Sequence, residues 1–190
     1  MVQVPQGWLP HVHKDKSFWI WAPAGWKKTA SLSKGSCFAL SSRSDVVLLE
    51  VFVLGLDERP EVAELAERAM KRSLLKDHAD LQIIHEGLCR LEKADNWDAL
   101  TRMAELGLVT DYDFFAYLRP ASSCRRLIVE YAERVKPGPD LPTKTTTDCF
   151  FLRRGDLLLQ INMKTISSQY AQLKPTFEQI AANTRLARLI

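Results

Sequence analysis

The chain has 190 residues, of which 46% are hydrophobic and 26% charged, and its formal net charge at pH 7 is +3. These values are typical of one globular domain that buries a core without disulfides or metals. The weak positive charge is interleaved with acidic residues, and no apolar run approaches the about 20 residues of a membrane helix. Composition therefore argues against nucleic-acid binding and against a membrane span.

The first quarter of the chain predicts an extension followed by an aromatic strand. Residues 1–16 contain no basic segment followed by an apolar one and no cysteine suited to lipidation. We therefore expect an N-terminal extension without a leader, and a cytoplasmic protein. The strand predicted at Phe18–Ala22 alternates Phe and Ile on one face with Trp19 and Trp21 on the other. The Pro-Ala-Gly that follows ends it.

Two further strands and a helix are predicted next. The strands are Cys37–Ser41 and Val46–Leu54, and the second is nearly all apolar, as in a central strand that is covered on both faces. A helix is predicted over Arg59–Leu75, because its apolar residues recur at helical spacing, and Asp57 is expected to cap it. The polar side of this helix is expected to carry Glu61, Glu64, Glu67, Lys71 and Arg72.

The middle of the chain is less regular. Asp80–Glu92 alternates as a strand does, and Asn96–Leu108 predicts a short helix. Tyr112–Leu118 fits neither period. Arg125–Val135 alternates again and predicts a strand, which the Pro-rich link Lys136–Pro142 joins to the last third of the chain.

The last third predicts a β-hairpin and a closing helix. The hairpin, Thr147–Thr165, has two apolar runs around a polar tetrad in which Gly155 can take the positive φ of a turn. Its second run places residues 157, 159, 161 and 163 on an apolar face and residues 158, 160, 162 and 164 on a more polar one. The helix is predicted over Tyr170–Arg185, with Pro175 in its first turn.

This order of strands, helix, strands and helix predicts an α+β fold. Short links and hairpins make the sheet largely antiparallel, with helices flanking it. The whole chain, 1–190, is expected to form a single domain.

No set of residues is typical of an enzyme. His11, His13 and Asp15 could share one side of an extended segment, but so few ligands near a terminus make a poor metal site. Ser122 lies beside no strand-to-helix elbow, and the Arg-Gly-Asp tripeptide at 154–156 is explained by the needs of a turn. We therefore expect no catalytic residue, no metal and no cofactor.

The cysteines give no further chemistry. Cys37, Cys89, Cys124 and Cys149 are far apart in the sequence and form no CxxC pair. They predict neither a zinc site nor a redox dithiol, and we expect all four to be reduced, with Cys149 in a strand core.

Three segments resemble the PsbP-like superfamily. They are Phe18-Trp-Ile-Trp-Ala-Pro-Ala-Gly-Trp26, the hairpin Asp148-Cys-Phe-Phe-Leu-Arg-Arg-Gly-Asp-Leu-Leu-Leu-Gln-Ile161, and the closing helix with Tyr170, Phe177-Glu-Gln-Ile180 and Asn183. This superfamily includes a photosystem II extrinsic protein, a Ran-binding release factor, DcrB-like lipoproteins and adaptor chaperones of type VI secretion effectors. The resemblance implies an α/β/α sandwich that binds other proteins. Relative to it, residues 93–120 are long and helix-like, and we expect an insertion there.

The tryptophans suggest where a partner binds. Trp19, Trp21 and Trp26 crowd into the first quarter, and a strand with an indole at every second position offers a large flat surface. They either pack beneath a helix or form part of a binding surface. We therefore hypothesise a non-enzymatic adaptor or chaperone that engages a protein partner through an apolar sheet face or this Trp-rich edge. The alternative is a small-ligand or lipid carrier with a pocket between helix and sheet; an enzyme with a dispersed site is third.

Overall fold

The computed structural model describes residues 4–15, 17–31, 33–42, 44, 46–56, 59, 61–91, 103–107, 120–133 and 142–186. The elements in chain order are β1 (Trp8–Val12), β2 (Phe18–Pro23), β3 (Lys27–Lys28), β4 (Phe38–Ser41), β5 (Val47–Leu56), α1 (Val62–Asp77), β6 (Gln82–Leu88), β7 (Ser123–Glu133), β8 (Thr143–Arg154), β9 (Leu157–Ile166), α4 (Ser167–Asn183) and β10 (Arg185–Leu186).

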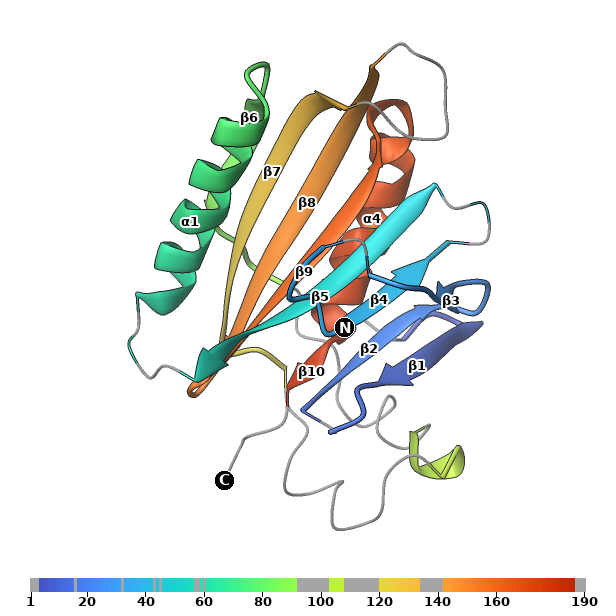
Figure 1. Cartoon of the computed structure of the whole chain (residues 1–190). Coiled ribbons are helices and arrows are strands. Elements are labelled where there is room, and N and C mark those ends of the chain that lie inside the picture. Colours follow the sequence, from blue (N-terminus) through green and yellow to red (C-terminus); the bar gives the residue numbers. More distant parts are fainter. Residues whose placement is uncertain are drawn as a thin grey trace.

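The strands form two antiparallel sheets (Figure 1). The main sheet has seven strands in the order β3-β4-β5-β9-β8-β7-β6, and the small sheet has three in the order β1-β2-β10. Each strand pair is antiparallel. This confirms the predicted α+β class with its largely antiparallel sheet. The order also leaves β6 at one edge of the main sheet.

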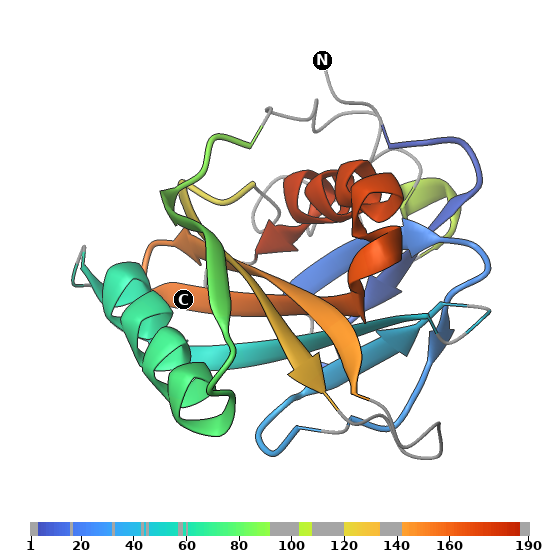
Figure 2. The ribbon, with the colours of Figure 1, turned by 90° about the horizontal axis from the view of Figure 1, so that it is seen from above.

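The main sheet buries apolar side chains on both faces. Because successive side chains of a strand point to opposite faces, β8 contributes to two cores. Phe150 faces α4 and the small sheet, in a core that includes Phe177. Phe151 faces α1, in a core that includes Ala63. Figure 2 shows the two helices on opposite sides of the sheet, as expected of an α/β/α arrangement.

The predicted hairpin is confirmed as β8 and β9. The pairing of Arg154 with Leu157 leaves a loop of two residues, which is shorter than the predicted tetrad, and Gly155 takes a φ of +59° there. The apolar face of β9 packs into the α4 core as predicted. Its other face is less open than its polarity suggested, because α1 covers it: Leu158 and Gln160 are both buried.

Residues outside the expected core also take part in the structure. Residues 8–12, which the sequence placed in an extension, form β1 and pair with β2. Pro10 is tolerated because β1 is an edge strand. Of residues 93–120, only 103–107 and 120 are described, and Met103 is buried in the α4 core. Of the helix predicted at Asn96–Leu108, the described residues 103–105 are helical.

Two expectations about the elements were wrong. Pro175 is not in the first turn of α4, because β9 runs directly into a helix that begins at Ser167. The far end of β5 is not covered on both faces, since Val53 and Leu54 are exposed. Asp57, Tyr112–Leu118 and the link Lys136–Pro142 up to residue 141 lie outside the described residues.

Candidate functional site

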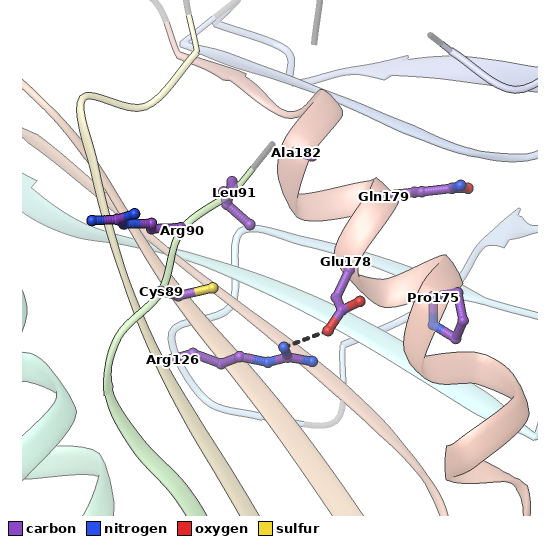
Figure 3. Close-up of a pocket in the computed structure, with 8 residues that line it drawn as sticks. All are labelled: Cys89, Arg90, Leu91, Arg126, Pro175, Glu178, Gln179 and Ala182. Atoms are coloured by element: carbon purple, nitrogen blue, oxygen red, sulfur yellow. Dashed lines mark hydrogen bonds and ion pairs between the residues drawn. The ribbon is translucent and has the colours of Figure 1, made fainter. Parts of the chain in front are cut away.

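A cavity of about 360 Å³ opens between α4 and the end of β6, above β7 (Figure 3). Its lining comes from the segment that follows β6, from β7 and from one side of α4: Cys89, Arg90, Leu91, Arg126, Pro175, Glu178, Gln179 and Ala182. A cavity of this size can hold a small molecule or a side chain of a partner.

Arg126, on β7, is held by a buried carboxylate. Its Nε donates to Oδ1 of Asp148 at 2.9 Å and its Nη2 donates to Oδ2 at 2.7 Å, which is a bidentate pair. The Asp148 side chain has no exposed surface and that of Arg126 is 8% exposed. The guanidinium also lies 4.7 Å from the centre of the Phe150 ring. Since both charges are buried, each depends on the other.

Tyr170, on α4, completes the buried network. Its hydroxyl donates to Oδ2 of Asp148 at 2.9 Å. Burial and the charge of Asp148 raise the pKa of this phenol, so it stays protonated as a donor. Burial alone lowers the pKa of Arg126, but the hydrogen bonds and charge of Asp148 outweigh it and hold that pKa above its ordinary value. The guanidinium of Arg126 therefore stays positively charged at the centre of this network.

The opposite side of the guanidinium meets an exposed carboxylate. Nη1 of Arg126 donates to Oε1 of Glu178 at 2.7 Å, and Glu178 is also 3.8 Å from Nζ of Lys174. Glu178 is 42% exposed, so water competes for it and the pair contributes little to stability. Asp148 is thus the permanent carboxylate partner of Arg126, whereas the carboxylate of a ligand can replace Glu178.

A cysteine in the wall of the same cavity, Cys89, has a second cysteine as its neighbour. Cys89 follows β6 and lies opposite Cys124 of β7, with its N–H donating to the Cys124 carbonyl at 2.9 Å. A hydrogen bond from the Cys124 thiol and the charge of Arg126 lower the pKa of Cys89, against the effect of burial. The same contact and burial raise the pKa of Cys124. No local pattern in the sequence indicates this pair, because only the register of β6 and β7 brings the two residues together.

A second feature lies on the other face, where α1 crosses β6 and β7. Glu67 was predicted on the polar side of the helix, yet its side chain has no exposed surface. It accepts hydrogen bonds from Nε of Arg125 and from the N–H of Gly87 at 2.8 Å. The prediction was wrong because helical spacing alone does not distinguish a solvated glutamate from one that meets an arginine on a neighbouring strand.

The outer side of this region carries exposed apolar side chains among polar ones. We use the name β6 edge surface for the exposed side chains of Leu75, Ile83, Ile84 and Leu88. Leu75 is one turn beyond Lys71 on α1, and Lys71 is paired with Glu86 of β6 at 2.6 Å, so the flank of α1 adjoins the strand. Ile84 is the extra residue of a bulge between the β6 and β7 registers.

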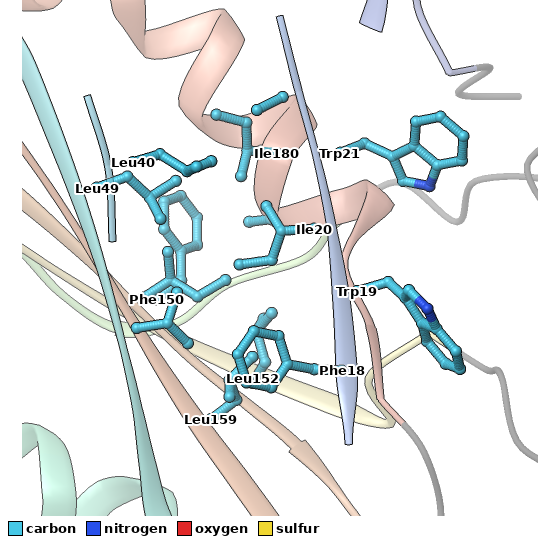
Figure 4. Packing of buried hydrophobic residues seen from close by; sticks show 14 of the residues in the cluster. Phe18, Trp19, Ile20, Trp21, Leu40, Leu49, Phe150, Leu152, Leu159 and Ile180 are labelled. Atoms are coloured by element: carbon cyan, nitrogen blue, oxygen red, sulfur yellow. The ribbon is translucent and has the colours of Figure 1, made fainter. Parts of the chain in front are cut away.

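The predicted partner-binding residues are buried. Trp19 and Trp21 are 1% and 0% exposed, and Trp26 is 9% exposed. Figure 4 shows the indoles of Trp19 and Trp21 on the opposite side of β2 from Phe18 and Ile20. A partner could reach the first two indoles only if the segments around them moved.

His11, His13 and Asp15, which were considered as metal ligands, form no reactive site. The Nδ1 atom of His13 is hydrogen-bonded to Asp15 and lies 3.3 Å from Oγ of Ser17. A catalytic triad needs the acid and the nucleophile on different ring nitrogens, which this arrangement lacks. His11 packs against the Phe38 ring instead. Across the described ranges, no group of three His, Cys, Asp or Glu residues could hold a metal ion.

No family model matches the chain, and no curated protein matches it. No helix within the described ranges is long and apolar enough to cross a bilayer.

Solved structures do match, over nearly the whole length of the chain. Cyanobacterial PsbP (CyanoP) from Synechocystis is 12% identical, with 96% of this chain and 94% of that chain covered and a TM-score of 0.52. The Ran-binding protein Mog1p of Saccharomyces cerevisiae is 8% identical, with 94% and 95% covered and a TM-score of 0.56. LpqN of Mycobacterium tuberculosis, described as involved in cell envelope biogenesis, is 11% identical, with 95% and 91% covered and a TM-score of 0.52. The resemblance seen in the sequence is thereby confirmed at the level of fold: this chain has a PsbP/Mog1-like fold.

Proposed function

We propose that this chain is a non-enzymatic protein-binding module of the adaptor or chaperone type, and that its partner docks on the β6 edge surface. One observation carries the proposal. β6 is an edge strand whose apolar side chains face water, with Ile83, Ile84 and Leu88 exposed by 40%, 55% and 76%. Exposed apolar side chains gathered on one edge are typical of a protein interface.

The contact is expected to come from side chains more than from the backbone of β6. A sheet edge can accept an added strand, but a bulge disturbs the regular ladder that such pairing needs. Ile84 lies at that bulge, and the N–H of Gly87 is already bonded to Glu67. We therefore expect an apolar segment of the partner to cover Ile84, Leu88 and the neighbouring Leu75.

One further point supports a binding role. Mog1p, which shares the fold, is a Ran-binding protein. The Trp-rich edge is a weaker candidate surface than the sequence suggested, since Trp19 and Trp21 are buried. The β6 edge surface replaces it in the proposal.

The test is quantitative affinity purification of the tagged full chain from its own host. The variant carries Ile84→Glu and Leu88→Glu, and the control is Leu54→Glu, which changes an exposed leucine on β5, away from the β6 edge surface. We expect a stoichiometric partner that the wild type and the control retain and the double variant loses, with all three equally folded by circular dichroism. A partner retained by all three proteins would place the interface elsewhere, and no stoichiometric partner in any sample would contradict the binding role.

The cavity favours a second role, the binding of a small anionic ligand. Its floor is the Arg126–Glu178 pair, so a carboxylate fits there better than a lipid chain. Thermal unfolding with succinate as probe tests this role. We expect succinate to raise Tm, and to raise it more in Glu178→Gln, because the competing carboxylate is then neutral. No rise above that given by sodium chloride of equal ionic strength would rule the role out.

A further inference from the structure

We propose that Cys89 and Cys124 form a reversible oxidation site, in which a peroxide converts the two thiols to a disulfide in the wall of the cavity. This inference is independent of the partner-binding role. It assigns Cys89 as the thiol that reacts first and Cys124 as the one that resolves it.

The register of the two strands brings the thiols within reach. Leu88 pairs with Arg125, so the next residues along, Cys89 and Cys124, lie directly opposite each other, as their backbone hydrogen bond confirms. Opposite residues of antiparallel strands have Cα atoms about 4.5 to 5.5 Å apart, within the about 4.4 to 6.8 Å that disulfides span. The Cys124 thiol itself lies 3.5 Å from the carbonyl of Arg125, to which it donates. The register therefore places the two cysteines as neighbours on adjacent strands, at a Cα separation that a disulfide can span.

The surroundings of the two cysteines explain why Cys89 should react first and Cys124 second. Cys89 is half-buried and lines the open cavity, whereas Cys124 is buried behind it. The groups that act on the Cys89 thiol are Cys124, Arg126, Asp148 and Glu178, and together with burial they bring its pKa to about 7. A thiol that is accessible, partly ionised and next to a second thiol is the usual form of a redox-sensitive cysteine.

The other two cysteines are poorly placed for the same chemistry. Cys149 is fully buried on the α1 face of the sheet, where burial raises its pKa. Cys37 is exposed at the start of β4, yet burial of its sulfur raises its pKa as well. Accessibility alone would make Cys37 the most reactive thiol, so a faster reaction at Cys89 is a discriminating result.

The reaction balances with hydrogen peroxide as the oxidant. The Cys89 thiolate attacks one peroxide oxygen, the O–O bond breaks, and the other oxygen leaves as hydroxide and takes a proton to become water. Sγ of Cys124 then attacks the sulfur of the Cys89 sulfenic acid. The S–O bond breaks and its oxygen leaves as water with the thiol proton of Cys124. Two thiols are oxidised to one disulfide and one peroxide is reduced to two waters.

The test is intact mass spectrometry of the full chain after treatment with one equivalent of hydrogen peroxide. We expect a loss of about 2 Da, peptide mapping that joins Cys89 to Cys124, and full reversal by dithiothreitol. Cys37→Ser, the matched control, should lose the same mass. Cys124→Ala should instead trap the Cys89 sulfenic acid, which dimedone labels. A disulfide that involves Cys37, or no mass loss in the wild type, would overturn the proposal.

A second measurement needs no variant. At pH 7, a thiol with a pKa near 7 is about half ionised, whereas an ordinary thiol is only a few per cent ionised. We therefore expect iodoacetamide to alkylate Cys89 about ten times faster than Cys37, with the Cys89 rate rising through about pH 7. A faster reaction at Cys37 would remove the basis for the assigned roles.

Discussion

The buried carboxylate of Glu67 on α1 is paired with the guanidinium of Arg125 on β7 and ties the helix to the sheet. Around this pair the contact between α1 and the sheet is apolar, through residues such as Ala66 and Met70. The pair therefore lies in a region of low dielectric, where each charge requires its partner.

Glu67→Ala should lower the free energy of unfolding by about 3 kcal/mol, because Arg125 loses its buried carboxylate and keeps only the 3.9 Å contact with Glu64, and the N–H of Gly87 loses its acceptor. The measurement is urea unfolding followed by circular dichroism. Glu64→Ala is the matched control, since Glu64 lies one turn earlier but is 37% exposed, and it should cost less than about 1 kcal/mol. Equal losses for the two variants would mean that burial of Glu67 does not matter.

The two carboxylates that pair with Arg126 should also differ in how much they contribute to the free energy of unfolding. Asp148→Asn should cost about 3 kcal/mol, because the buried guanidinium then loses its bidentate partner. Glu178→Gln should cost less than about 1 kcal/mol, because Glu178 is exposed. Thermal and urea unfolding of both variants measure this. A larger loss for Glu178→Gln would reverse the assignment of permanent and exchangeable carboxylates.

The sequence predicted local structure better than contacts between distant segments. The alternation in β9 and the turn at Gly155 are local, and both were confirmed. The pairing of Arg126 with Asp148 depends on the β7–β8 register, which no local pattern contains. A signal was present nonetheless, since each residue is a charge beside a run of apolar strand residues, and such a charge needs a buried partner.

The predicted partner-binding residues, Trp19, Trp21 and Trp26, stay a prediction, for a related reason. A strand of alternating indoles predicts one large apolar face, but periodicity does not tell whether that face meets a partner or the protein itself. In the structure it is buried, like the face that carries Phe18. Likewise, Cys89 and Cys124 are 35 positions apart, and only the strand pairing shows that they are neighbours.

Trp21→Ala should therefore act on stability and not on a binding surface. The side chain is fully buried in the α4 core, so its truncation should lower the free energy of unfolding by about 3 to 5 kcal/mol. Leu9→Ala, at an exposed position of the adjoining β1, should change it by less than about 0.5 kcal/mol. A stable Trp21→Ala protein that loses its partner would restore the Trp-rich edge as the interface.

The loop between β1 and β2 should contribute to stability in a pH-dependent way. Burial acts to raise the pKa of Asp15, but hydrogen bonds from Ser17 and His13 outweigh it and lower the pKa from 3.8 to about 2. Because the folded state holds the carboxylate ionised, its contribution is fully present above about pH 4 and is lost as the pH falls toward about 2.

Asp15→Asn removes this charge. The difference in free energy of unfolding between wild type and Asp15→Asn should thus be largest near neutral pH and shrink between about pH 4 and about pH 2. Urea unfolding of both proteins across this range measures it, and a difference that grows as the pH falls would show that the folded state does not favour the ionised form.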